Sequence, residues 1–122
     1  MAEKVNLSIA ANFEKNLQSI RCFYHEQNHP EHYTSLLDRL FDIIIPNLQE
    51  HPLIGFDFLA QRVNSIEEQR QVENIKKRLP SNSSIRQYNS QDYILLYSLK
   101  DSDLVFLAIK HQRQLYFDLR AT

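Results

Sequence analysis

A short basic segment near the C-terminus holds the residue types best suited to chemistry. Lys110, His111 and Arg113 lie within four consecutive positions, and Tyr116 follows closely. An imidazole titrates near neutral pH and can transfer protons, while a guanidinium holds anions through paired N–H donors. The segment comes directly after an apolar run, so we expect it at the end of a strand. It either catalyses, binds a partner or only terminates a sheet.

Two apolar runs before this segment predict a β-hairpin. Tyr93–Leu99 and Leu104–Ile109 are rich in aromatic and branched residues, and a polar tetrad separates them. This composition is typical of two strands joined by a tight turn.

Alternation along the second strand predicts the direction of the side chains at its end. Strict alternation places His111 on the same face as Leu107, and Lys110 on the face of Phe106. Because solvent can reach both faces at the end of a strand, either side chain is a candidate for function.

The first half of the chain predicts a strand followed by two helices. Apolar and polar residues alternate over positions 5–9, which indicates a half-buried strand. A helical stripe follows, formed by Phe13, Leu17, Ile20 and Tyr24. Pro30 begins a second helix, which the short connection should pack antiparallel to the first. We expect Pro46 to bend or end this second helix, because proline lacks an N–H and clashes with the preceding turn.

The middle of the chain predicts a polar helix and a third short strand before the hairpin. Gly55 is the only glycine, so it indicates a position that needs positive φ or close backbone approach. Ser65 predicts the start of a polar helix that ends before Pro80. The basic run 76–78 suits the C-terminal end of a helix dipole, and Ile85–Tyr88 predicts a strand.

The order of these elements predicts an α+β fold. An N-terminal strand, a helical hairpin, an inserted polar helix and a three-stranded antiparallel meander should form one sheet with helices on one face. With 122 residues, the chain is expected to be a single domain, 1–122.

Bulk properties favour a cytoplasmic protein. No apolar run approaches the roughly 20 residues of a membrane span, and the first residues lack an apolar signal segment. The single cysteine cannot form an internal disulfide. The net charge is −1, but residues 61–122 carry ten Lys/Arg against seven Asp/Glu, and residues 1–60 carry four against eight. The basic half therefore suits a phosphate backbone or an acidic protein partner.

Four segments carry a resemblance to a known family. They are Leu48 to Gly55 with Pro52 between them, Arg86 on its short strand, Asp92-Tyr-Ile-Leu-Leu-Tyr97, and Ile109-Lys-His-Gln-Arg113. Their order resembles the RelE/ParE superfamily of toxins from type II toxin–antitoxin systems, and the last segment is similar to the I-x-H-x-R ending of the ParE-like, plasmid-stabilisation branch. Ile94 departs from the arginine that many members carry. The resemblance covers about residues 4–56 and 84–119, so 57–84 is interpreted as an insertion.

The resemblance implies a toxin that a cognate antitoxin holds inactive, with two competing mechanisms. A ParE-like toxin poisons DNA gyrase by protein–protein contact, whereas a RelE-like toxin enters the ribosome and cleaves mRNA. Ribosomal nucleases are usually strongly basic, so the net charge and the sequence ending favour the ParE-like mechanism. A non-toxic interaction module on the same fold is a third hypothesis.

Each mechanism assigns roles to the same small set of residues. For a nuclease, His111 would be the general acid or base, Arg86 and Arg113 would stabilise a pentavalent phosphate, and Tyr116 would complete the set. RNA supplies its own 2′-hydroxyl nucleophile, so no metal or other cofactor is expected. For target or antitoxin binding, the predicted contacts are Arg86, Lys110, His111, Arg113 and Tyr97. An extended acidic antitoxin segment would dock between helices and sheet and cover the two arginines and His111.

Simpler structural roles compete with these assignments. His111 could hydrogen-bond to backbone at the sheet edge, and the two arginines, expected on neighbouring strands, could pair with Asp92 or Asp118. Tyr97 could belong to the sheet core together with Tyr88, Tyr93 and Tyr116 rather than stack on bases. The remaining histidines show no spacing that closes on a metal; they are His25, His29, His32 and His51.

Overall fold

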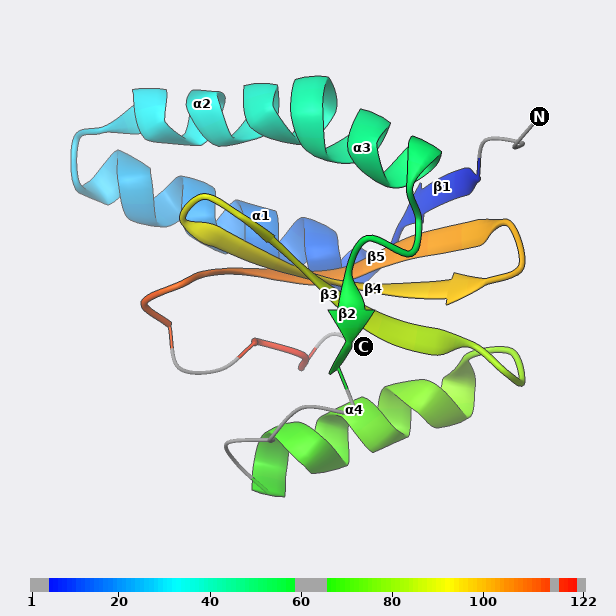
Figure 1. The fold of residues 1–122 in the computed structure, drawn as a ribbon. Helices are drawn as coiled ribbons and strands as arrows, with labels where there is room; N and C mark the ends of the chain where they lie inside the picture. The colour runs from blue at the N-terminus through cyan, green and yellow to red at the C-terminus, as the bar shows by residue number, and fades with distance from the viewer. Residues whose placement is uncertain (1–4, 59–65, 115–116, 121–122) are drawn as a thin grey trace.

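The computed structural model describes residues 5–58, 66–114 and 117–120, and Figure 1 shows a mixed sheet with helices on both of its faces. The sheet has five strands in the order β1-β5-β4-β3-β2. The strands are β1 (Asn6–Ile9), β2 (Phe56–Asp57), β3 (Ser84–Ser90), β4 (Tyr93–Lys100) and β5 (Asp103–His111). The helices are α1 (Ala11–Glu26), α2 (Pro30–Arg39), α3 (Ile45–Glu50) and α4 (Ile66–Arg78). The predicted α+β class is confirmed.

The predicted hairpin and meander are present as β3, β4 and β5. β3 pairs antiparallel with β4, and β4 pairs antiparallel with β5 through a turn at Asp101 and Ser102. Asp101 has a φ of 52°, the left-handed conformation that aspartate tolerates in tight turns. β1 joins this meander in parallel with β5, and β2 adds a short antiparallel edge beside β3.

A β-bulge at Leu107 overturns the side-chain directions that strict alternation predicted. Leu96 pairs with Ala108 and Tyr97 pairs with Phe106, so Leu107 is an extra residue on β5. Leu107 and Ala108 consequently lie on the same face of the sheet, and the alternation reverses after them. His111 therefore shares the face of Phe106, not that of Leu107.

The first face of the sheet is covered by the helical hairpin that the sequence predicted. Figure 1 shows α1 and α2 running antiparallel above the sheet, with α3 continuing from α2. Phe13 of α1 stacks on Phe106 of β5, with ring centroids 5.1 Å apart. The buried core on this side also includes Leu36, Leu40, Ile44, Leu48, Leu95, Tyr97 and Leu104.

The polar helix α4 covers the opposite face, so the expectation that all helices lie on one face is wrong. Ile75 of α4 packs with Ile85, Leu96 and Leu107 from the sheet. Phe58 and Phe117 complete this second core with ring centroids 6.0 Å apart. The apolar stripe of α4 is thin because this helix covers only a small core. Many of its other residues are polar and exposed.

The second helix does not end at Pro46, contrary to one of the two expected outcomes. A π-helical turn over Leu40–Ile44 joins α2 to α3, and Pro46 lies in the first turn of α3. A π turn widens the hydrogen-bond spacing, so it accommodates a residue that lacks an N–H.

Among the described helices, none has the length and the apolar composition that a membrane span requires.

Gly55 is required for close packing rather than for a positive φ. Its φ is not positive, but a Cβ at this position would lie 2.6 Å from the Tyr97 hydroxyl and 2.7 Å from the Gln87 carbonyl oxygen. The prediction of close backbone approach is therefore confirmed. The contact brings the loop after α3 against the middle of the sheet, where the Gly55 N–H donates to Tyr97.

Candidate functional site

The candidate site is a pocket of about 430 Å³ between α1 and the end of β5. His111 and Arg113 line it, as the sequence led us to expect for neighbouring functional groups. The rest of the lining is Asn16, Ser19, Ile20, Phe23, Tyr24, Tyr93, Ile109, Gln114 and Asp118. We call this the α1–β5 pocket.

Half of the pocket is contributed by α1, and the sequence patterns did not predict this half. Ile20 and Tyr24 belong to the predicted helical stripe, and both are partly buried. Phe23 lies just outside that stripe and is 56% exposed. The available signal was the group of Ile20, Phe23 and Tyr24 on neighbouring turns of one helix, since a contiguous apolar patch, unlike a single residue, marks a contact surface.

His111 is held by its own turn. Its backbone N–H donates to Gln114 Oε1 over 2.9 Å, and its ring Nδ1 accepts the N–H of Arg113 over 3.1 Å. An accepting Nδ1 is unprotonated, so the neutral ring carries its proton on Nε2. The backbone hydrogen bond of the simpler structural hypothesis is therefore present. The ring also packs edge-on against Tyr93, with centroids 5.4 Å apart.

Tyr24 and Tyr93 form the polar part of the pocket floor. Their hydroxyl oxygens are 2.6 Å apart, which joins α1 to β4. Burial, with the hydrogen bond to Tyr24, raises the pKa of Tyr93 above that of an ordinary phenol. Tyr93 is therefore a neutral hydrogen-bonding group at physiological pH, not a base.

Arg113 and Lys110 have different surroundings although only three positions separate them. Arg113 is exposed, and within the described residues no carboxylate forms an ion pair with it. Lys110 lies on the other face of the sheet, where its Nζ is 5.2 Å from the Phe117 ring centroid and donates to the Gln114 carbonyl. Arg113 is thus the cation available to an anionic group at the pocket.

Arg86 is not part of this pocket. It pairs with Tyr97 on β4, whereas His111 pairs with Tyr93, four residues or roughly 13 Å away along the strand. β4 lies between β3 and β5, so the expectation that Arg86 and Arg113 occupy neighbouring strands is wrong. The Arg86 guanidinium donates instead to the carbonyls of Gly55 and Leu53, over 2.5–3.1 Å.

Tyr97 belongs to the core, which corrects its assignment to a binding surface. It is fully buried, and its hydroxyl donates to the Pro52 carbonyl over 2.7 Å. Burial raises its pKa, although the Gly55 N–H favours the opposite shift. Tyr116 lies outside the described residues, so its proposed role stays a prediction.

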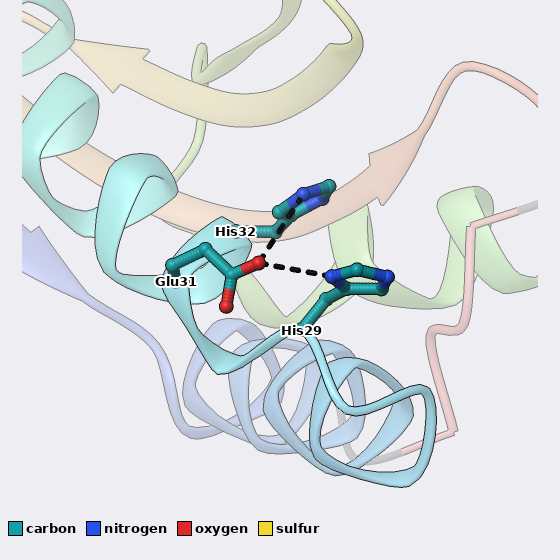
Figure 2. A group of neighbouring side chains, drawn as sticks. All are labelled: His29, Glu31 and His32. Atoms are coloured by element: carbon teal, nitrogen blue, oxygen red, sulfur yellow. Dashed lines mark hydrogen bonds and ion pairs between the residues drawn. The ribbon is translucent and has the colours of Figure 1, made fainter.

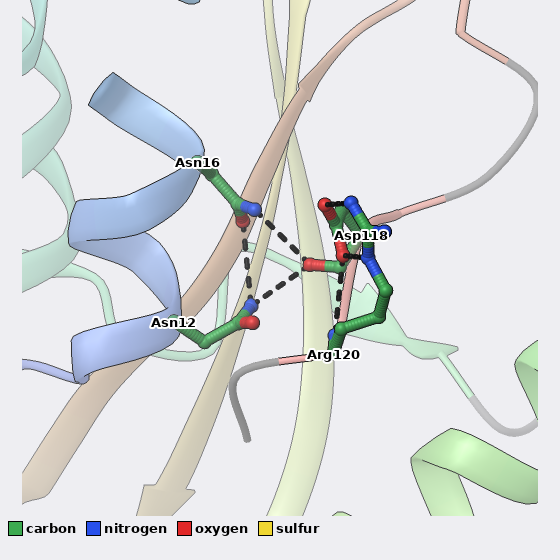
Figure 3. A network of polar contacts seen from close by, with 4 residues as sticks. All are labelled: Asn12, Asn16, Asp118 and Arg120. Atoms are coloured by element: carbon green, nitrogen blue, oxygen red, sulfur yellow. Dashed lines mark hydrogen bonds and ion pairs between the residues drawn. The ribbon is translucent and has the colours of Figure 1, made fainter. Parts of the chain in front are cut away.

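Two buried asparagines of α1 fix the position of the pocket against β5. β1 ends at Ile9, and beyond it Asn12 donates to the Leu107 carbonyl while Asn16 accepts the Ile109 N–H, each over 3.0 Å. Both asparagines also donate to the Asp118 carbonyl, as Figure 3 shows. The helix therefore replaces the missing strand partner at the bulge.

Asp118 and Arg120 close this network at the surface. Arg120 Nε and Nη2 donate to the two carboxylate oxygens of Asp118 over 2.9 and 2.8 Å (Figure 3). These hydrogen bonds lower the pKa of Asp118. One structural hypothesis paired Asp118 with Arg86 or Arg113. In the structure, Asp118 pairs with Arg120 instead.

Comparison with protein families agrees with this architecture. The family model for the ParE toxin of type II toxin–antitoxin systems, parDE, matches residues 7–116. This chain belongs to the ParE toxin family. The match begins in β1 and continues past the end of β5, so it includes α4 and both walls of the α1–β5 pocket. No curated protein sequence matches the chain.

Membership in the ParE family identifies the general role and one partner. The protein is the toxin of a type II toxin–antitoxin system, and the family implies a cognate antitoxin. The predicted superfamily resemblance is confirmed.

This ParE-family chain also has a second group of polar side chains, which is not part of the pocket lining. Figure 2 shows His29, Glu31 and His32 gathered at the beginning of α2. Their ligand atoms all lie within 4.8 Å of one another. The spacing of the histidines did not predict a metal site, although His29 and His32 are only three positions apart.

Proposed function

We propose that this ParE-family toxin acts in the cytoplasm by binding and poisoning DNA gyrase, and that it contacts its partners through the α1–β5 pocket. The alternative within the superfamily is mRNA cleavage at the ribosome. The contacts of Arg86 are the observation that carries the proposal.

A ribonuclease that uses His111 needs positive charge close to the reacting phosphate. Arg86 was the candidate for this role besides Arg113, but its guanidinium is occupied by the carbonyls of Gly55 and Leu53. It also lies on the far side of β4 from β5. Of the candidate arginines, only Arg113 lines the same pocket as His111, which supports binding over phosphate chemistry.

The composition of the pocket suits a protein partner. Ile20, Phe23 and Ile109 supply apolar surface, while Arg113 and His111 supply polar groups beside it. Protein interfaces concentrate binding energy in aromatic and arginine side chains around an apolar centre. An apolar side chain flanked by a carboxylate would satisfy both parts of this pocket.

The antitoxin would then act by competition. An extended acidic segment lying along α1 and the end of β5 could place a carboxylate on Arg113 and an apolar side chain in the pocket. Gyrase and antitoxin would exclude each other because they share this surface.

The test is expression of the full chain without antitoxin, together with Arg113→Ala, Phe23→Ala and His111→Ala variants. Arg70→Ala is the matched control, since Arg70 is an exposed arginine on α4, across the sheet. Growth, plasmid supercoiling and mRNA integrity are measured in each strain.

We expect growth arrest and lost supercoiling with intact mRNA, relieved by Arg113→Ala and Phe23→Ala but not by Arg70→Ala. Rapid mRNA cleavage that disappears in His111→Ala would replace the proposal with the nuclease mechanism. Normal growth of the strain with the unmodified chain would leave a non-toxic interaction module.

A further inference from the structure

The connection between α1 and α2 brings two imidazoles and a carboxylate to one point on the surface. Glu31 Oε1 is 2.9 Å from His29 Nδ1 and 3.8 Å from His32 Nε2. Figure 2 shows both rings directed toward this carboxylate oxygen. The two ring centroids are 5.0 Å apart.

Local backbone structure explains why these three side chains meet. Pro30 occupies the first turn of α2, and His29 precedes it with a non-helical backbone. His29 is the residue that precedes α2 and His32 lies in the first turn of that helix, so their side chains are neighbours at its N-terminal end. Asn28, at a φ of 59°, turns the chain back from α1 immediately before them.

We propose that His29, Glu31 and His32 form a binding site for a divalent transition-metal ion of the zinc class. Zinc takes imidazole nitrogens and carboxylate oxygens at about 2.0–2.2 Å, and three protein ligands leave one position for water. The two nitrogen ligands favour zinc, nickel, cobalt or copper over magnesium and calcium, which prefer oxygen.

The side chains are able to reach coordination distances. The His29, Glu31 and His32 side chains are 57%, 64% and 55% exposed, so small rotations meet little steric resistance. Glu31 supplies an oxygen ligand between the two rings, since its Oε1 faces a nitrogen of each imidazole. A bound ion would replace the hydrogen bond between His29 and Glu31, and the neutral His29 ring would then carry its proton on Nε2.

The proposed site lies at one end of a series of ring contacts that leads to the α1–β5 pocket. The His32 ring packs against Tyr24, with centroids 5.2 Å apart. Tyr24 in turn hydrogen-bonds Tyr93, which packs against His111. The chain has no tryptophan and six tyrosines, so its intrinsic emission comes from tyrosine. Nickel or copper bound beside Tyr24 should therefore quench part of that emission.

The experiment is a titration of the purified, tag-free full chain with Zn²⁺ by calorimetry and with Co²⁺ by visible absorption. His29→Ala, Glu31→Gln and His32→Ala each remove one proposed ligand. His25→Ala and His51→Ala are matched controls, since each removes an exposed histidine that is not part of the cluster. Far-UV circular dichroism checks that every variant is folded.

We expect one ion per chain for the unmodified protein and both controls. Each ligand variant should lose more affinity than the roughly ten-fold that removal of a supporting hydrogen bond to a ligand typically costs. Nickel should quench tyrosine emission in the controls and not in the ligand variants. Absence of binding to the unmodified chain, or unchanged affinity in Glu31→Gln and His32→Ala, would overturn the proposal.

Discussion

Asn16 on α1 accepts a hydrogen bond from the backbone N–H of Ile109 on β5 over 3.0 Å, and this contact attaches the helix to the strand that ends in His111. Asn16 is only 5% exposed, so its loss leaves the Ile109 N–H and part of the Asp118 carbonyl without a protein partner. Asn16→Ala should lower the free energy of unfolding by about 1–3 kcal/mol per buried group affected. Urea denaturation measures this change.

Gln18→Ala is the matched control for that substitution. Gln18 is an exposed amide on the same helix, so we expect a change within about 0.5 kcal/mol. If both variants lose the same stability, the hydrogen bonds at the bulge contribute nothing beyond helix propensity.

Gly55→Ala should destabilise the fold by about 1–3 kcal/mol, because the new methyl group would meet Tyr97 and the Gln87 carbonyl. Combining it with Tyr97→Phe tests which contact matters. The double variant removes the hydroxyl but leaves the Gln87 carbonyl oxygen at 2.7 Å and the ring carbon at 2.8 Å from the new methyl group. We therefore expect no rescue, and thermal unfolding that returned to the Tyr97→Phe value would refute the close approach of backbone.

Substitutions of Arg86 and Arg113 should have different effects: the first should lower stability, and the second should impair function. Arg86→Ala removes the hydrogen bonds to the Gly55 and Leu53 carbonyls, and it should cost about 1.5–3 kcal/mol of stability. Arg113→Ala should change stability by less than about 0.5 kcal/mol, since its side chain is exposed. Denaturation and growth assays on both variants check this. The opposite pattern would place Arg86 in the functional surface.

The raised pKa of Tyr93 predicts a loss of stability in alkali. Because the folded state favours the protonated phenol, its contribution is complete below the unfolded pKa of about 10 and is lost as pH rises toward the folded pKa. Between pH 9 and pH 11 this group should account for about 1.4 kcal/mol, the value of one pKa unit. Tyr93→Phe should show a correspondingly smaller decrease in urea denaturation over the same range. Equal decreases in the two proteins would contradict the assignment.

Local sequence patterns were enough to predict much of the fold. The two apolar runs predicted β4 and β5, and Ser65 and Pro80 bracketed α4 closely. Gly55 was predicted to allow close approach, and its contact with Tyr97 confirms this. These features depend on residues near in sequence or on a residue type with one strong physical meaning.

Features that depend on long-range contacts could not be predicted in the same way. The bulge at Leu107 has no local signal, because Leu107 and Ala108 continue an ordinary apolar run. Asn12 and Asn16, which bind the backbone there, lie about 95 positions earlier. The contacts of Arg86 depend likewise on the loop after α3, which approaches β3 only in the folded chain.

For the α1–β5 pocket too, the residues that are close in sequence were predicted and those brought together by long-range contacts were not. His111 and Arg113 were predicted as neighbours because they are close in sequence, and both line the pocket. The wall from α1 was missed because Phe23 and Tyr24 are brought to β5 only by tertiary packing.

The parallel pairing of β1 with β5 has a consequence for the order of events during synthesis. Asn6 and Asp103 hydrogen-bond across a separation of 97 positions, and both walls of the pocket come from elements adjoining this pair. The ribosome releases β1 long before β5. The strand β1 therefore cannot pair until almost the entire chain has been synthesised. We expect nascent chains that stop before β5 to lack the pocket altogether. If partners bind at the pocket, as proposed above, the synthesis of β5 sets the earliest moment at which the toxin becomes harmful or its antitoxin can recognise it.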